Sequence, residues 1–95
     1  MVLPQIVADI LGHIGVSPNS RWYVGIATNP RDRLFNQHNV SETNGRWIYR
    51  DAGTEQNARD TEAYLLRHYS FNGGVGGGSR PCSVYAYEIT SSTVE

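Results

Sequence analysis

Apolar residues in the first fourteen positions of the chain recur at the spacing of a helix. They stand three or four positions apart and would share one face of an amphipathic helix: Leu3, Ile6, Val7, Ile10, Leu11 and Ile14. Pro4 suits the first turn of such a helix, and Gly15 with the polar segment at 17–20 would end it. The pattern therefore predicts a helix over residues 3–14.

The rest of the chain alternates between strand-like and helix-like patterns. Aromatic and β-branched residues dominate three segments and predict strands: RWYVGIAT (21–28), RWIYR (46–50) and SVYAYEIT (83–90). Asn29 and Pro30 would begin a second helix that continues as RDRLFNQHN, and Thr54 would cap a third over residues 55–69. Connections this short favour one domain over residues 1–95. Its fold class would be α/β (α+β), a small three-stranded, mainly antiparallel sheet flanked by helices.

Charge changes this picture only locally. The formal net charge is −1, so the chain has no overall basic field that would attract nucleic acid. All eight basic residues are arginines between Arg21 and Arg80, and six of the nine acidic residues share that stretch, which leaves it with two net positive charges. Because arginine makes bidentate contacts with phosphate and carboxylate groups, the pattern favours a local site for an anionic ligand.

Several classes of protein are disfavoured by what the sequence lacks. A single cysteine, Cys82, forms no intrachain disulfide, which suits a reducing cytosol, and we interpret it as a packing residue. No run of eighteen apolar residues predicts a membrane span, and the first residues do not have the pattern of a signal peptide. We therefore expect a cytoplasmic protein that does not associate with membranes. The three histidines lack zinc-site spacing with cysteine.

Glu62 is the first candidate for chemistry. It lies in line with Ala58, Leu65 and Tyr69 on the predicted third helix, among apolar neighbours. An unpaired carboxylate is costly there, so Glu62 should have a partner. Two interpretations stay open: a salt bridge to an arginine such as Arg33, or a role as metal ligand or catalytic carboxylate.

The segment WYVGIATNPRDRLFNQH (22–38) resembles the GIY-YIG nuclease superfamily. Its YVG matches the second half of the family signature, and Arg33 lies ten residues after Tyr23, where the family commonly has an arginine. ARDTEAYLL (58–66) looks like the later helix of the family, in which a glutamate follows an alanine and binds a divalent metal. The resemblance runs from Trp22 to about Leu66, with weaker support to Ile89.

The resemblance implies a phosphodiesterase or endonuclease that uses magnesium or manganese and acts on nucleic acid. Tyr23 would position or deprotonate the attacking water, and Arg33 would stabilise the charge that grows on the phosphoryl oxygens. Glu62 would hold the metal. His38 would be a general base or proton relay, because imidazole titrates near neutrality. The plain alternatives are a core aromatic for Tyr23 and a helix-face histidine hydrogen-bonded to backbone for His38.

The chain departs from the family pattern at three places. The tyrosine of the first motif would stand about ten residues before Tyr23, and that residue is His13. His13 either replaces the tyrosine or is an ordinary histidine at a helix end. The residue four positions after Arg33 is Gln37, and His38 follows one position later, which is about a hundred degrees of rotation on an α-helix. Asn72 is a loose match to a late asparagine of the family.

The segment NGGVGGGSRP (72–81) offers a second place for an anion. Successive glycines can turn backbone N–H groups toward an anion in a nest, and a serine hydroxyl and a guanidinium would add to it. The expected phosphate- or nucleotide-binding residues are Arg31, Gly74, Gly76, Gly77, Ser79 and Arg80. The alternative is a surface connection with no ligand.

Three functional hypotheses follow. The first is the metal-dependent nuclease. The second is a non-catalytic binder of the same fold that sequesters a nucleotide or a cyclic oligonucleotide, as a virus-encoded sponge would, through the arginines and the glycine-rich loop. The third is an adaptor whose first helix is buried in a homodimer, which an exposed apolar face around Ile6 and Ile10 would favour. Aromatic residues next to arginine, as in RWY and RWIYR, suit base stacking but also suit a small core.

Overall fold

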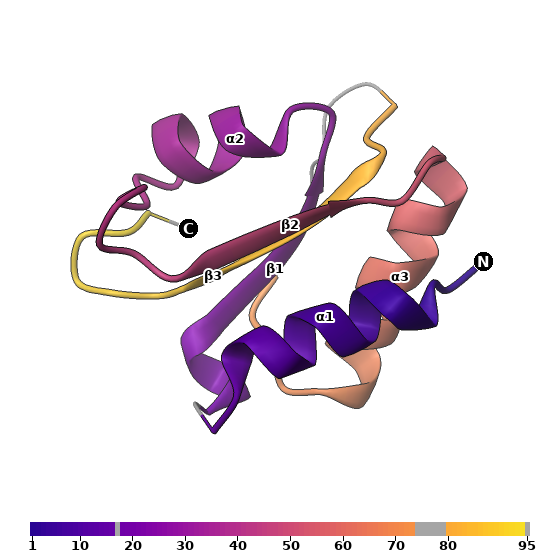
Figure 1. Cartoon of the computed structure of the whole chain (residues 1–95), viewed down its shortest axis with the longest axis horizontal. Helices are drawn as coiled ribbons and strands as arrows, with labels where there is room; N and C mark the ends of the chain where they lie inside the picture. The colour runs from indigo at the N-terminus through magenta and orange to yellow at the C-terminus, as the bar shows by residue number, and fades with distance from the viewer. Residues whose placement is uncertain (17, 74–79, 95) are drawn as a thin grey trace.

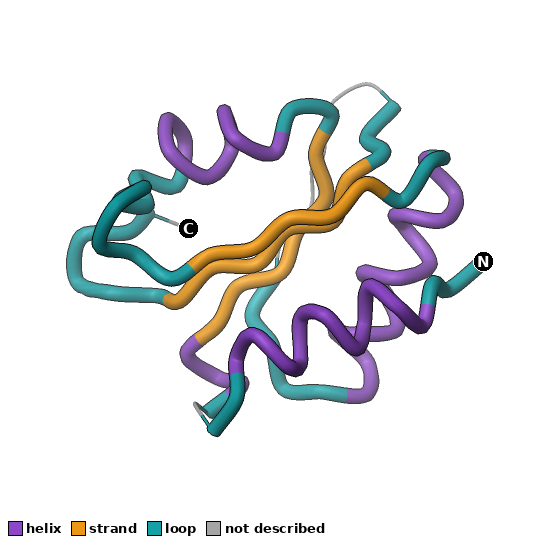
Figure 2. Tube along the Cα trace, viewed as in Figure 1, coloured by secondary structure: helices purple, strands orange, loops and turns teal. Residues whose placement is uncertain are grey.

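The chain folds as three helices and a three-stranded antiparallel sheet, which confirms the predicted fold class (Figures 1 and 2). The computed structural model describes residues 1–16, 18–73 and 80–94. Its elements follow the predicted order: α1 (Pro4–Ile14), η1 (Asn19–Arg21), β1 (Trp22–Ala27), α2 (Pro30–Asp32), η2 (Arg33–Gln37), β2 (Trp47–Asp51), α3 (Glu55–His68) and β3 (Ser83–Glu88). The side chains of Asn29 and Thr54 accept the capping hydrogen bonds of α2 and α3, as expected.

The last strand in the sequence is the central strand of the sheet. β3 pairs with β1 on one side and with β2 on the other, both antiparallel. Tyr87 stands opposite Tyr23 of β1 and Trp47 of β2, while Tyr85 stands opposite Gly25 and Tyr49. Because side chains alternate along a strand, these residues all face the same side of the sheet.

The other side of the sheet carries the larger apolar core. α1 and α3 cover it, and the buried residues of the sheet on this side are Trp22, Val24, Ile26, Ile48, Val84 and Ala86. Ile6 and Ile10 of α1 are 5% and 0% exposed. The apolar face that would have favoured the adaptor hypothesis is therefore packed inside the chain. No helix among the described residues is long and apolar enough to cross a bilayer.

α2 and η2 cover the tyrosine-bearing side of the sheet. The buried cluster there is small and aromatic, with Phe35, Trp47, Tyr49 and Ile89 packed at its rim: Tyr23, Ala27, Leu34, Val40, Tyr85 and Tyr87. Two helices thus support one face of the sheet, while a single short helical segment and the chain end cover the face that carries the hydroxyl groups (Figure 1).

The outer edge of β1 is protected by the segment that follows α3. The N–H of Val24 donates to the carbonyl of Asn72, and the N–H of Asn72 donates to the carbonyl of Trp22, both at 2.9 Å. The side chain of Asn72 donates to the carbonyl of Ser20. Asn72 therefore continues the sheet as an isolated parallel bridge beside Tyr23.

Gly25 is required by the close approach of the Tyr85 ring. A β-carbon built on Gly25 would lie 2.5 Å from the Tyr85 hydroxyl oxygen and 2.6 Å from Cζ. Tyr85 is 1% exposed, so its ring has no free space into which it could withdraw. The glycine of the YVG sequence therefore makes room for the hydroxyl of the opposite strand.

We expect Gly25→Ala to lower the free energy of unfolding by about 1–3 kcal/mol, the usual cost of overpacking a filled core. Gly12→Ala is the matched control, because a β-carbon at this exposed helical position meets no heavy atom within 4 Å. That control should raise stability by about 0.5–1 kcal/mol. Urea denaturation of both variants measures the difference, and equal stabilisation by the two substitutions would contradict the close approach.

Candidate functional site

The Tyr85 hydroxyl is the centre of a buried polar cluster on the aromatic side of the sheet. It lies 2.7 Å from Nε2 of His38. The other ring nitrogen of His38, Nδ1, lies 2.7 Å from the main-chain carbonyl oxygen of Val94. His38 is only 4% exposed, so these contacts take the place of water around its ring.

Two further tyrosines enclose the imidazole. The ring centroids of Tyr23 and Tyr87 lie 4.9 Å and 4.8 Å from that of His38. The Tyr87 hydroxyl is 3.1 Å from Nδ1 of His38 and 3.4 Å from the Val94 carbonyl oxygen. Tyr23 and Tyr87 stack on each other at 5.2 Å. The imidazole is therefore held in one orientation by aromatic contacts as well as by hydrogen bonds.

Arg33 of η2 and Glu62 of α3 act electrostatically on the Tyr85 hydroxyl from two different elements. Burial raises the pKa of the Tyr85 hydroxyl well above its ordinary value, and the neighbouring Tyr23 adds to that increase. The positive charge of Arg33 and its hydrogen bond to Tyr85 lower the pKa of Tyr85, whereas the negative charge of Glu62 raises it. The side chains of Arg33 and Glu62 are both half-buried.

Glu62 lies in an environment that disfavours its charged form. Burial raises the pKa of the Glu62 carboxyl above its ordinary value, and the charge of Arg59 opposes this only in part. No salt bridge joins Glu62 to Arg33 in the described part of the chain, so the simple ion-pair interpretation is wrong for that pair. Among the described residues, no salt bridge to the Glu62 carboxylate offsets its desolvation.

A π-helical turn brings His38 into the cluster. The N–H of His38 donates to the carbonyl of Arg33 at 2.8 Å, which is a bond across five residues instead of the four of an α-helix. The wider turn removes the extra rotation that one added residue would otherwise cause. His38 therefore lies above Arg33 on the same face, although the sequence spacing places Gln37 there.

The position ten residues before Tyr23 does not supply a tyrosine to this site. His13 lies in α1, and its ring packs edge-on against Trp22, a core residue of the opposite side of the sheet. Burial and the charges of Arg46 and Arg50 lower the pKa of His13. The tyrosines next to Tyr23 come from β3 instead, and neither was selected as a site residue from the sequence. The alternation in SVYAYEIT was the available signal, because it placed Tyr85 and Tyr87 on one strand face.

The remaining predicted site residues lie apart from the cluster or outside the described residues. Arg31 forms a salt bridge with Glu42 at the surface, and its guanidinium lies over the Phe35 ring. Arg80 is exposed, with a left-handed backbone at φ 54°. The other four positions of the predicted anion nest fall outside the described residues: Gly74, Gly76, Gly77 and Ser79.

A divalent metal would have to be held by few protein ligands. Among the described residues, no three side chains of His, Cys, Asp or Glu come together as a metal-binding group. Mg²⁺ commonly uses one or two carboxylates and completes its shell with waters and substrate phosphate oxygens. A single half-buried carboxylate such as Glu62 fits this mode and does not fit a structural zinc site.

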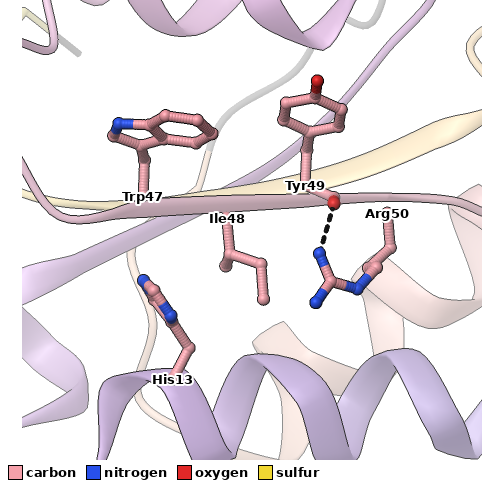
Figure 3. A pocket seen from close by; sticks show the side chains of 5 residues that line it. All are labelled: His13, Trp47, Ile48, Tyr49 and Arg50. Carbon is pink, nitrogen blue, oxygen red and sulfur yellow. Dashed lines mark hydrogen bonds between the residues drawn. The ribbon is translucent and has the colours of Figure 1, made fainter. Parts of the chain in front are cut away.

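A separate surface hollow of about 400 Å³ lies along the outer edge of β2 (Figure 3). His13 and Ile48 approach it from the α1 side, and Trp47 and Tyr49 stand on the other side of the strand (Figure 3). The Arg50 guanidinium donates to the Tyr49 carbonyl and to Asp9. This hollow contains none of the clustered residues around Tyr85, so we do not place the chemistry there.

The π-helical turn gives a direct test of the cluster. Deletion of the exposed Gln37 would convert the turn to α-helical spacing and leave His38 above Arg33. We expect the deletion variant to fold with a free energy of unfolding within about 1 kcal/mol of the parent chain, because only an exposed residue is lost.

Insertion of one alanine after Gln37 is the matched control. It would rotate His38 by about a hundred degrees and break its two buried hydrogen bonds. We expect a loss of about 2–5 kcal/mol, since each unsatisfied buried group costs about 1–3 kcal/mol. Chemical denaturation measures both variants, and equal losses for deletion and insertion would show that the turn does not set the position of His38.

No protein-family model matches the chain, and no curated protein or solved structure is significantly similar to it. The function therefore has to be inferred from the side chains around Tyr85.

Proposed function

We propose that the protein is a metal-dependent phosphodiesterase that cleaves nucleic acid, with its active site at the Tyr85 hydroxyl. The observation that carries the proposal is that this hydroxyl is hydrogen-bonded to His38 and lies within the electrostatic influence of both Arg33 and Glu62. His38 can take its proton, Arg33 offers a positive charge, Glu62 offers a negative one, and Tyr23 packs beside it. Phosphodiester hydrolysis needs these elements: a proton acceptor, charge stabilisation and a cation site.

The pairing of β1 with β3 offers a specific way to relate this chain to the GIY-YIG nucleases. The first family motif is a tyrosine strand that precedes YVG, and no such strand precedes it here. β3 lies beside β1 in antiparallel pairing and presents Tyr85 and Tyr87 to Tyr23. In the proposal, β3 takes the place of the missing strand and Tyr85 takes the place of the missing tyrosine, so the tyrosine strand comes last in the sequence.

The proposed proton path runs from water to His38. The attacking water would lose a proton to the Tyr85 oxygen while the Tyr85 proton moves to Nε2 of His38. No free tyrosinate is then needed, which matters because burial raises the pKa of Tyr85. The imidazolium that forms would be stabilised by the Val94 carbonyl at Nδ1. The leaving oxygen would take its proton from water, and the proton on His38 would return through the Tyr85 hydroxyl to solvent after the product leaves.

Arg33 and Glu62 would act on the phosphate. The Arg33 guanidinium would donate to the phosphoryl oxygens as their charge increases. Glu62 would hold a magnesium or manganese ion, which polarises the phosphate and stabilises the leaving oxygen when bound. Burial of Glu62 strengthens its preference for a cation, because a bound positive charge would offset the desolvation of the carboxylate.

Substitution of Glu62 tests this proposal. We expect the parent chain to cleave one or more members of a labelled panel of single- and double-stranded DNA, RNA and cyclic di- and trinucleotides when Mg²⁺ or Mn²⁺ is present. Glu62→Gln should reduce that cleavage by at least about 100-fold while the fold is kept, because the amide has the same shape but does not attract the ion.

Glu55→Gln is the control for a general effect on α3. Glu55 lies on the same helix and pairs at the surface with Arg59, so its loss should leave cleavage unchanged. Gel analysis would follow the polymers, and mass spectrometry would follow the small nucleotides. Intact substrates throughout, with a nucleotide recovered bound to the parent chain, would overturn hydrolysis and favour the nucleotide-binding alternative.

The alternative is a protein that sequesters a nucleotide or cyclic oligonucleotide. It would use Arg33 for binding without a chemical step. Arg33 would bind the phosphate, and the rim aromatics Trp47 and Tyr49, which stack at 6.0 Å, would lie near a base. The hydrogen-bonded His38 and Tyr85 favour hydrolysis over this alternative, because a binding pocket does not need a proton acceptor behind its hydroxyl group.

A further inference from the structure

We propose that the segment from Thr90 to Val94 positions His38 in the candidate site. The main chain of Val94 would hold the imidazole in the tautomer that accepts a proton from Tyr85. Val94 is therefore a positioning residue that acts through His38. Its catalytic consequence rests on the proposed function, whereas the tautomer itself is independent of any substrate.

The segment is attached to His38 at two points. The N–H of Val94 donates to the main-chain carbonyl of His38 at 2.7 Å, and Nδ1 of the His38 ring lies 2.7 Å from the Val94 carbonyl oxygen. The neighbouring Asn39 side chain donates to the carbonyl of Ser92 at 2.9 Å. The chain end thus returns to lie beside the end of η2, as the yellow segment in Figure 1 shows.

A local turn fixes where Val94 lies. The N–H of Thr90 donates to the Thr93 hydroxyl at 3.0 Å, and that hydroxyl donates to the Thr90 carbonyl at 3.0 Å. The N–H of Thr93 also donates to the Thr90 carbonyl. Because β3 ends at Glu88, this turn reverses the chain directly after the central strand and carries Val94 back over the aromatic face.

Hydrogen-bond chemistry then decides the position of the ring proton. A main-chain carbonyl oxygen can only accept, so the nitrogen 2.7 Å from it, Nδ1, must carry a hydrogen. In the neutral ring Nε2 is then an acceptor, and the Tyr85 hydroxyl must donate to it. The Tyr87 hydroxyl is within reach of the same carbonyl, so it can donate there without competing for Nε2.

The opposite tautomer would break this order of donors and acceptors. With the hydrogen on Nε2, the Nδ1 lone pair would face the Val94 carbonyl oxygen, and two acceptors 2.7 Å apart repel each other. Tyr85 would then receive a hydrogen bond from His38 and would have no base for its proton. The C-terminal segment therefore determines whether His38 can accept a proton.

Nitrogen-15 NMR of the histidine rings tests the proposal on the whole chain, without metal or nucleic acid, at mildly alkaline pH where imidazole is neutral. We expect His38 to carry its hydrogen on Nδ1. A chain that ends at Thr90 should change to the Nε2–H form, which predominates in free histidine. The signals of His13 and His68, which make no contact with the described part of this segment, serve as internal controls.

The Tyr85→Phe variant distinguishes the effect of Val94 on the His38 tautomer from the effect of Tyr85. This variant removes the partner of Nε2 and keeps Val94, so His38 should still carry its hydrogen on Nδ1. A change to Nε2–H in this variant would assign the tautomer to Tyr85 and overturn the proposal, even if the shortened chain did not fold. An Nε2–H or doubly protonated ring in the parent chain, or an unchanged ring in a folded shortened chain, would also overturn it.

The outcome is independent of the nuclease test. A correct tautomer without cleavage of any substrate would leave the role of Val94 intact and remove the proposed function. Cleavage that depends on Glu62, together with Nε2–H in the parent chain, would keep the proposed function and remove the role of Val94.

Discussion

The hydrogen bond between Tyr85 and His38 is the contact on which the aromatic side of the structure depends. It determines three features that are distant in sequence. Gly25 lacks a side chain because the Tyr85 ring occupies its space. The turn after Arg33 widens to π-helical spacing, which brings His38 to the ring. The chain end folds back so that a carbonyl meets the second ring nitrogen. A buried polar pair with unsatisfied atoms would be costly, so each feature also protects the stability of the fold.

The two sides of the sheet differ in the side chains that fill them. Apolar side chains of α1, α3 and the three strands fill one side, where packing needs no particular hydroxyl or charge. The other side is covered by a short helical segment and by the segment that follows β3, and it carries the half-buried Arg33 of η2, whereas Glu62 comes from α3. Tyr85 belongs to the aromatic side, and its strand is paired on both edges, so it cannot shift without disturbing the entire sheet.

Local sequence patterns were sufficient to predict the helices and strands, but they were not sufficient to predict the candidate site. Helical spacing and alternation located all three helices and all three strands, because those patterns depend on neighbours in the sequence. Tyr23, Arg33, His38 and Glu62 could be selected in advance from residue type and the family resemblance. Tyr85 could not, because its role depends on pairing with a strand sixty residues earlier. The π-helical turn hid the correct face of His38, and the contact from Val94 uses a backbone atom, which residue identity does not reveal.

The arrangement of donors and acceptors around Tyr85 also distinguishes the two functions proposed for this cluster. Binding a phosphate requires positive charge and fixed N–H groups, and Arg33 would satisfy that need beside any apolar neighbour. A hydroxyl backed by an imidazole, with that imidazole oriented in turn by a carbonyl, adds nothing to the affinity for an anion. It does add a route by which a proton can leave an attacking water. Placing the Tyr85 hydroxyl, the His38 imidazole and the Val94 carbonyl together on a small aromatic core costs free energy. The proposed proton transfer explains that cost more easily than ligand binding does.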